Sequence, residues 1–351
     1  MGASERMQRD NTGSMYNFLC DGCRLCHSGA KMVLFITGVC SRGCFYCPIS
    51  SERKHADVTY ANERKVDSDV DILEEARQMD ALGTGITGGE PLARLDRTLY
   101  YIRLLKATFG RYHHIHLYTC TAPSAEVLGQ LKDAGLDELR MHPPEELWDR
   151  FNGSAYHIAL RMAIELKISA GIEIPAIKKV PEIEDVLIET GAFLNLNELE
   201  FSDMNSEALK FNGYIFRDEF SNAVQGSETL AHEIVLNSKA NIRYCSSRFK
   251  DAVQLRERLK RTASRMARPF DEITGDGTVV YGEIKGDIIG AQRQLQRLEV
   301  PRDMYACIDA DRIEIAWWIL DDIKEELTGT EKSIVERYPL RDGLVVERIP
   351  L

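Results

Sequence analysis

The sequence predicts an α/β protein: a full or partial (β/α) barrel of parallel strands, followed by a small C-terminal α+β domain. Short apolar, β-rich runs alternate with segments of helical periodicity from Met32 to Arg268, which indicates parallel strands joined by helices. Roughly six or seven such units fit in this span, as a barrel requires. The turn-rich stretch 267–277 then marks a domain boundary.

The predicted elements of the barrel follow one another in regular order. Strands are expected at 33–37, before the turn at 88–91, and at 114–120, 138–142, 171–177, 193–201 and 241–245. Helices are expected at 69–83, 95–108, 124–135, up to about 168, 182–190, 227–239 and, as one long helix, 248–268. Because the chemistry of such barrels gathers on loops that follow the carboxyl ends of strands, polar or metal-binding residues at those points are candidate site residues.

Three regions are expected along the chain. Residues 1–31 form an irregular, cysteine-rich segment, residues 32–268 the barrel, and residues 269–351 an α+β domain that serves substrate recognition. In the last region the patterns predict a strand at 278–284, a helix at 287–298, a strand and helix within 305–328, and a hairpin over 333–350.

Composition indicates a soluble globular protein. The chain has 351 residues, 44% of them apolar, and a formal net charge of −11. This balance argues against a protein coated in nucleic acid, although it leaves room for a local basic patch. The polar N-terminus lacks a secretory signal, and the apolar run 313–320 is too short to cross a membrane. We therefore expect a cytoplasmic protein without membrane association.

Cysteines are the main chemical signal. Six of the nine fall into two triplets: C-x2-C-x2-C at Cys20, Cys23 and Cys26, and C-x3-C-x2-C at Cys40, Cys44 and Cys47. Disulfides are rare in the cytosol, so such spacing indicates metal binding or redox chemistry. Three close thiolates can hold three irons of a [4Fe–4S] cluster and leave the fourth open. A zinc site completed by a distant ligand is the alternative.

Two motifs together resemble the radical S-adenosylmethionine (SAM) superfamily. The first is the second triplet, with Tyr46 before its last cysteine, directly after the first barrel strand. The second is ITGGEP (86–91), at the end of the next strand. The resemblance covers about residues 32–250, and the chain is most similar to an archaeal branch related to pyruvate formate-lyase activating enzymes.

The resemblance implies an oxygen-sensitive enzyme whose [4Fe–4S] cluster is ligated by Cys40, Cys44 and Cys47, with SAM on the fourth iron. An electron from a donor such as ferredoxin or flavodoxin would then cleave SAM, and the 5′-deoxyadenosyl radical would take a hydrogen atom from a substrate. It also implies SAM contacts, in which the carbonyls of Gly88 and Gly89, with Glu90, receive the ammonium, the Tyr46 backbone meets adenine, and Thr119 adds a polar contact.

The first triplet, at 20–26, has the wrong spacing for that motif and precedes the barrel. Cys245, at the end of the last predicted barrel strand, is a candidate fourth ligand. The site is then either a closed zinc or iron–sulfur site that ties the N-terminal segment to the barrel, or an auxiliary [4Fe–4S] cluster of the kind that many radical SAM enzymes carry.

The substrate is less defined by sequence. Among substrate classes, nine basic side chains and two acidic ones within 242–268 give a slight preference for RNA, such as tRNA, bound at the basic helix 248–268. For the segment itself, a solvated outer helix is the favoured interpretation. Protein or peptide modification, including glycyl-radical activation, and transformation of a small metabolite are alternatives. Outside enzymology, a non-catalytic metal-binding or electron-transfer protein remains open.

Overall fold

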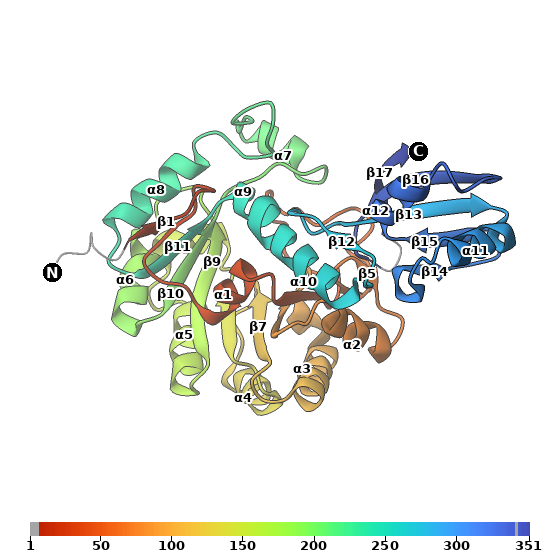
Figure 1. Cartoon of the computed structure of the whole chain (residues 1–351). Helices are drawn as coiled ribbons and strands as arrows, with labels where there is room; N and C mark the ends of the chain where they lie inside the picture. Colours follow the sequence, from red (N-terminus) through yellow and green to blue (C-terminus); the bar gives the residue numbers. More distant parts are fainter. Residues whose placement is uncertain (1–6, 341–342) are drawn as a thin grey trace. The chain divides into compact units, whose positions relative to one another are not determined.

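The computed structural model describes residues 7–340 and 343–351, which divide into two compact units (Figure 1). The first unit comprises the described residues up to Arg77 together with Ala81–Gln254, and the second comprises Gln78–Asp80 and Leu255–Leu351. The described part of the N-terminal segment therefore belongs to the first unit, and the division falls inside the segment that was predicted to be one long helix.

Seven parallel strands form the centre of the first unit. Their order in the sheet is β11-β10-β9-β8-β7-β6-β3, and β3 does not pair with β11 among the described residues, so the barrel is partial. The bounds are β3 (Lys31–Phe35), β6 (Gly83–Thr87), β7 (His114–Thr119), β8 (Glu138–Met141), β9 (Ser169–Pro175), β10 (Phe193–Asn197) and β11 (Asn241–Cys245). The predicted fold class is confirmed.

Short antiparallel strands cover both edges of this sheet. At one edge β2 (Met15–Tyr16) pairs with β11, and β1 (Gln8–Arg9) pairs with β2. At the other edge β4 (Tyr60–Ala61) pairs with β3, and β5 (Arg64–Lys65) pairs with β4.

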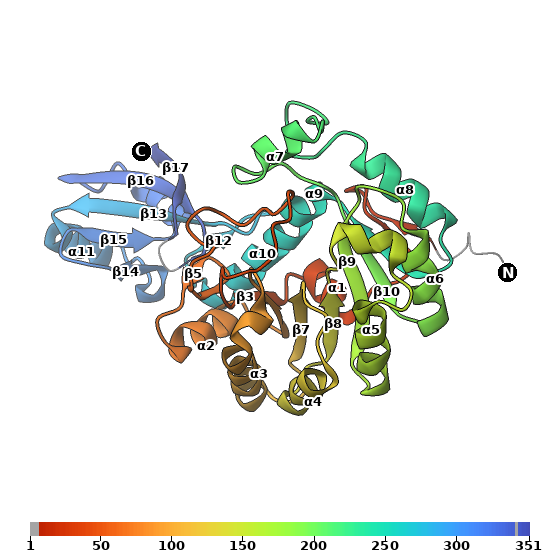
Figure 2. The same ribbon diagram turned by 180° about the vertical axis from the view of Figure 1, so that it is seen from behind.

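Helices follow most of the strands, at the positions that periodicity predicted. They are α2 (Asp69–Gln78), α3 (Leu95–Phe109), α4 (Ala125–Ala134), α5 (Ala155–Glu165), α6 (Pro181–Thr190) and α8 (Ser227–Asn237), with the 3₁₀ turns η2 (Pro91–Arg94) and η3 (Glu145–Arg150) between them. Helix α4 shows how the sequence sets their ends: the Ser124 hydroxyl accepts from Val127 N at its start, and Gly135 adopts φ 107° at its end. Figures 1 and 2 show α3, α4 and α5 along one side of the sheet and α1 (Asp21–His27) on the other.

Four details correct the sequence predictions. The cysteine-rich segment is not wholly irregular, because α1 places Cys23 and Cys26 on its buried face; seven residues are too few to reveal helical periodicity. Strand β10 ends at Asn197 rather than at 201. The segment 248–268 is broken into α9 (Ser247–Phe249), a π-helical turn η4 (Lys250–Leu255) and α10 (Arg256–Met266). An unpredicted excursion over 198–226 carries the short helix α7 (Ser206–Phe211).

The second unit contains an antiparallel sheet of the strands β12 (Glu272–Ile273), β13 (Val279–Gly286), β14 (Tyr305–Cys307), β15 (Arg312–Ile315), β16 (Thr330–Arg337) and β17 (Val345–Pro350). Helices α11 (Ile288–Arg297) and α12 (Trp317–Ile323) and the turn η5 (Arg302–Met304) complete it. Its core contains Ile284, Leu295, Ile313 and Leu320, all fully buried. The expected α+β arrangement is present, and residues 341–342 of the predicted hairpin lie outside the described residues.

Candidate active site

A cavity of about 820 Å³ lies at the carboxyl ends of the parallel strands, and we call it the chamber. Loops that are distant in sequence contribute to its wall, so the motifs singled out by sequence analysis face one space. These wall residues include Cys40, Cys44, Tyr46 and Cys47 after β3, Gly88 and Gly89 after β6, Thr119 at the end of β7, and Cys245 at the end of β11.

The glycine turn and the cysteine loop are held together backbone to backbone. Gly89 N donates to Thr37 O at 2.7 Å, and Glu90 N donates to Val39 O at 2.8 Å. A Cβ atom on Gly88 would lie 2.6 Å from Thr37 O, and one on Gly89 would lie 2.6 Å from Gly38 O. Glycine is therefore required here for the close approach of two protein backbones, and not for a positive φ. The expected contact of these glycines with SAM remains a prediction.

The three thiols of the cysteine loop are half-buried on the chamber wall. Cys40 Sγ lies 3.7 Å from Cys120 Sγ, and this hydrogen bond lowers the pKa of Cys40 to about 6. Burial raises the pKa of the Cys44 thiol. Within residues 7–340 and 343–351, no three Cys, His, Asp or Glu side chains are grouped to hold a single metal ion. A [4Fe–4S] cluster gives each cysteine a separate iron, so three thiols spread along one loop are compatible with such a cluster.

Glu90 is buried behind the chamber wall rather than on it. Its carboxylate accepts from Thr119 Oγ1 at 2.8 Å, from Cys120 N at 2.8 Å and from Leu92 N at 2.8 Å. Glu90 thus fixes the end of β7 against the turn that follows β6. Its expected role as a SAM ligand stays a prediction, while Thr119, which does line the chamber, is oriented by this same carboxylate.

Tyr46 is held by contacts on both its side chain and its backbone. Its hydroxyl lies 2.8 Å from His142 Nε2, and its carbonyl accepts from Asn205 Nδ2 at 3.1 Å. Burial raises the pKa of the Tyr46 hydroxyl. The loop that carries the last two cysteines of the motif is therefore anchored by residues that follow β8 and precede α7, which sequence analysis did not link to it.

The second group of cysteines opens onto the same chamber. Cys23, Cys26 and Cys245 line it, and Cys20 lies behind them with its Sγ 3.3 Å from Cys23 Sγ. Cys26 and Cys245 pack with Phe249. The predicted proximity of Cys245 to the triplet at 20–26 is thus present in the fold, although the bound group remains a prediction.

Two buried arginines beside this group were not connected with it by sequence reasoning. Arg140 Nη2 donates to Cys20 Sγ at 3.2 Å, and Arg243 Nη2 donates to Cys245 Sγ at 3.5 Å. The alternation of β8 and β11 was the available signal, because it aims one side of each strand into the barrel. Both guanidinium charges favour the thiolate forms of these cysteines, Arg140 at Cys20 and Cys23 and Arg243 at Cys23 and Cys245.

Arg140 is also part of a network with carboxylates. Its Nε donates to Glu138 at 2.6 Å, and its Nη1 donates to Glu173 at 2.8 Å. Asn195 and Asn197 donate to the same Glu173 carboxylate at 3.0 and 2.9 Å. Burial opposes ionisation of Glu173, but the Arg140 charge and these amides outweigh it, so the pKa of Glu173 is lowered.

Comparison with known proteins decides the family. Residues 34–147 match the model of the radical SAM superfamily. A protein of Methanocaldococcus jannaschii named "Putative glycyl-radical enzyme activating enzyme" is 36% identical over 352 residues, which is 96% of this chain and 94% of that protein. This chain belongs to the radical SAM superfamily. The resemblance predicted from the two motifs is confirmed, and the alternative of a non-catalytic protein is not supported.

As a radical SAM enzyme, the chain uses an iron–sulfur cluster and SAM, and it needs a source of electrons. Residues 277–351 match a model described as a domain of unknown function. A crystal structure of methylornithine synthase aligns over 62% of this chain and 71% of its own, at 13% identity and a TM-score of 0.41, which adds nothing to the assignment. No helix in the described parts of the chain is long and apolar enough to span a membrane.

Proposed function

We propose that this enzyme cleaves SAM at a [4Fe–4S] cluster held by Cys40, Cys44 and Cys47 and removes a hydrogen atom from a glycyl residue of a substrate protein. The observation that carries the proposal is the shared chamber, in which the three thiols, the Gly88–Gly89 turn and Thr119 line one cavity. When bound, the cluster supplies the electron that breaks the bond between the sulfonium sulfur and the 5′ carbon. A ferredoxin or flavodoxin is the proposed donor of that electron.

The protein's own residues position the reactants. The thiols hold the cluster, and the Gly88–Gly89 turn keeps its backbone beside them through the contacts with Thr37 and Val39. Thr119 lines the chamber at the end of β7, where its hydroxyl donates to Glu90. The chamber of about 820 Å³ lies among strand ends and loops, which limits the access of water to a reactive radical.

A substrate protein is favoured by the excursion between β10 and α8. Phe211 and Phe220 are 91% and 96% exposed, and Ile215 is 60% exposed. The same excursion contributes Phe201, Ser202, Asp203 and Asn222 to the chamber wall. Large exposed apolar side chains beside a cavity are typical of a protein-binding surface, and the relative in M. jannaschii carries the name of an enzyme that acts on another enzyme.

The expected RNA partner is less well supported. Phosphate binding needs cations that are free to pair with phosphates and displace the counterions of the nucleic acid, but most cations of 242–268 already have partners. Arg243 is buried against Phe249, Lys250 pairs with Glu200, Lys260 with Glu257, Arg261 with Asp80, and Arg268 with Asp271. RNA binding at 248–268 therefore remains the second candidate.

The first test is production of 5′-deoxyadenosine by anaerobically reconstituted protein supplied with SAM and dithionite. Wild type and Cys307→Ala, which removes a thiol of the second unit, should form it, and Cys40→Ala should not. Equal amounts from wild type and Cys40→Ala would contradict the proposed function.

The substrate class is tested by isotope transfer. Proteins and RNA are prepared separately from a source culture grown with glycine deuterated at Cα, or with deuterated nucleosides, respectively. Mass spectrometry should find deuterium in 5′-deoxyadenosine only with the labelled proteins. If deuterium reached 5′-deoxyadenosine from the labelled RNA alone, the substrate would be RNA and the proposed protein substrate would be wrong.

A further inference from the structure

Four buried cysteines from two distant segments meet beside the chamber. The exposed fractions of Cys20, Cys23, Cys26 and Cys245 are 3%, 1%, 5% and 9%. The first three lie at the start of α1 or within it, and Cys245 ends β11. Three of the four, Cys23, Cys26 and Cys245, line the chamber itself. We propose that these four thiolates bind a second iron–sulfur cluster, of the [4Fe–4S] type, on the chamber wall.

The charge beside these thiols calls for an anionic partner. Arg243 is 3% exposed, its Nε has no hydrogen-bond partner, and no carboxylate lies within ion-pair distance of it among residues 7–340 and 343–351. Its side chain contacts the thiols of Cys23 and Cys245 and lies over the ring of Phe249. A buried charge without a counter-charge is costly. Four thiolates around an oxidised [4Fe–4S] core form a dianion, which would neutralise Arg243 and add to the partners of Arg140.

The arrangement of the thiols favours a cluster over a single zinc ion. Cys20 and Cys23 pack with Phe193, whereas Cys26 and Cys245 pack with Phe249. Zinc needs all four sulfurs at about 2.3 Å from one point, whereas these two pairs lie in separate apolar clusters. A cluster instead offers one iron to each sulfur.

Polar hydrogens aimed at the sulfurs support the same conclusion. Arg140 Nη2 reaches both Cys20 and Cys23, and Asn195 Nδ2 lies 3.6 Å from Cys23 Sγ. Hydrogen bonds to sulfur are one of the means by which proteins set the reduction potential of iron–sulfur clusters. Because both groups of cysteines face one chamber, a substrate that fills it would contact the second cluster as well as SAM.

The test removes the first cluster and leaves the second. The variant Cys40→Ala/Cys44→Ala/Cys47→Ala, reconstituted with iron and sulfide, should keep about four irons and four sulfides per chain. Adding Cys23→Ala and Cys26→Ala should reduce iron to background. The matched control adds Cys120→Ala and Cys307→Ala instead and should keep the iron. Zinc alone, or no metal, in the triple variant would overturn the proposal.

A second measurement uses the intact chain, in case the variants fold poorly. After reduction, electron paramagnetic resonance should show two iron–sulfur signals, only one of which changes when SAM is added. One SAM-responsive signal with about four irons per chain would overturn the second cluster. The result is separable from the proposed function, because iron retained by the triple variant is informative even if wild type makes no 5′-deoxyadenosine.

Discussion

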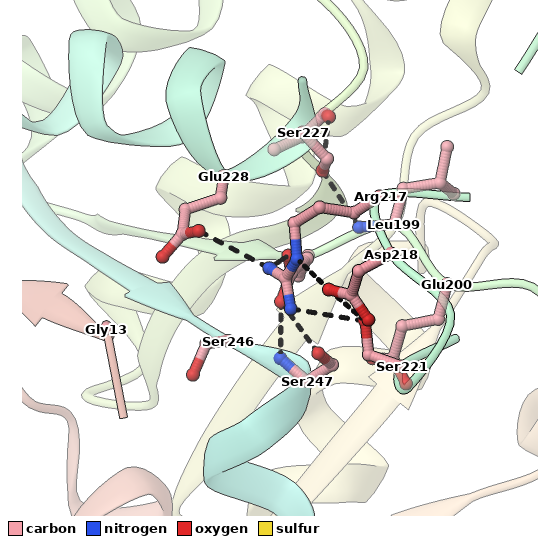
Figure 3. Close-up of polar contacts among 12 residues, drawn as sticks. Gly13, Leu199, Glu200, Arg217, Asp218, Ser221, Ser227, Glu228, Ser246 and Ser247 are labelled. Atoms are coloured by element: carbon pink, nitrogen blue, oxygen red, sulfur yellow. Dashed lines mark hydrogen bonds and ion pairs between the residues drawn. The ribbon is translucent and has the colours of Figure 1, made fainter. Parts of the chain in front are cut away.

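Arg217 donates to the buried carboxylate of Glu198, the residue after β10, with Nη1 2.5 Å from Oε1. The other carboxylate oxygen of Glu198 accepts from the backbone N and the hydroxyl of Ser247 at 2.7 and 2.8 Å. Figure 3 shows Arg217 between Asp218 and Glu228, to which it is also linked. Glu198 lines the chamber, so Arg217 ties the later part of the excursion to its first residue on the chamber wall.

Replacement of Arg217 by Met should therefore destabilise the first unit. Glu198 would remain buried with only the Ser247 donors, which we expect to cost on the order of 2 kcal/mol of unfolding free energy. Urea denaturation measures this loss. Lys210→Met is the matched control, since Lys210 is an exposed cation on α7, and it should change stability by less than about 0.5 kcal/mol. Equal losses of unfolding free energy in the two variants would contradict a stabilising contact between Arg217 and Glu198.

Gly89→Ala should separate the glycine turn from the cysteine loop. The new methyl group would meet the carbonyl oxygens of Gly38 and Val39 at 2.6 and 2.7 Å, and backbone atoms cannot move aside cheaply. We expect a loss of about 1–3 kcal/mol and lower iron content after reconstitution. Gly129→Ala is the control: it lies inside α4 with nothing within 4 Å, and Ala there should be neutral or stabilising by about 0.5–1 kcal/mol.

His113 should contribute to acid sensitivity. Burial lowers the pKa of His113 to about 4, and its Nε2 lies 2.8 Å from Thr84 Oγ1. In the unfolded chain its pKa is about 6.5, so between pH 6.5 and 4 the unfolded state binds a proton that the folded state excludes. Stability should fall as the pH falls through this window, by up to about 3 kcal/mol from this group.

The measurement is the urea unfolding free energy of wild type and His113→Gln from pH 7 to pH 4. The variant has no group at this position that titrates in the window, so its stability should fall less steeply. Parallel pH profiles would show that His113 does not contribute, whatever the difference in absolute stability.

The exposed aromatic residues of the excursion should serve substrate binding without serving SAM cleavage. Phe211→Ser/Phe220→Ser should leave 5′-deoxyadenosine formation without substrate unchanged and reduce deuterium transfer from labelled protein by about tenfold, the effect of losing about 1.4 kcal/mol of binding. Tyr112→Ser is the control, because Tyr112 is 82% exposed but lies after α3. An equal reduction by Tyr112→Ser would contradict a docking surface at the excursion.

Many residues of the chamber wall could be predicted from the sequence because each motif follows a strand of the parallel sheet. In a parallel sheet each strand ends at the same edge, so Cys40, Gly88, Thr119 and Cys245, each placed at a strand end, had to approach one another. The same reasoning linked Cys245 to the triplet at 20–26, although it did not foresee helix α1.

Contacts between side chains could not be predicted from the order of strands and motifs. Glu90 follows the glycine turn, yet its carboxylate points to the end of β7, because the backbone donors of Leu92 and Cys120 converge there. The ion pairs of the basic segment 248–268 could not be predicted for a related reason. Its charge count is a property of sequence, whereas its ion pairs with residues such as Asp80 and Glu200 depend on long-range folding.

The pairing of β2 with β11 has a consequence for the solubility of the enzyme. Met15 and Tyr16 occupy the hydrogen-bonding edge of β11, and Asn17 closes it further by accepting from Ile242 N. An uncovered strand edge is a template for sheet growth between molecules. The segment that carries Cys20, Cys23 and Cys26 thus also covers the edge of β11. Its detachment would expose this aggregation-prone strand edge even while the barrel remains folded.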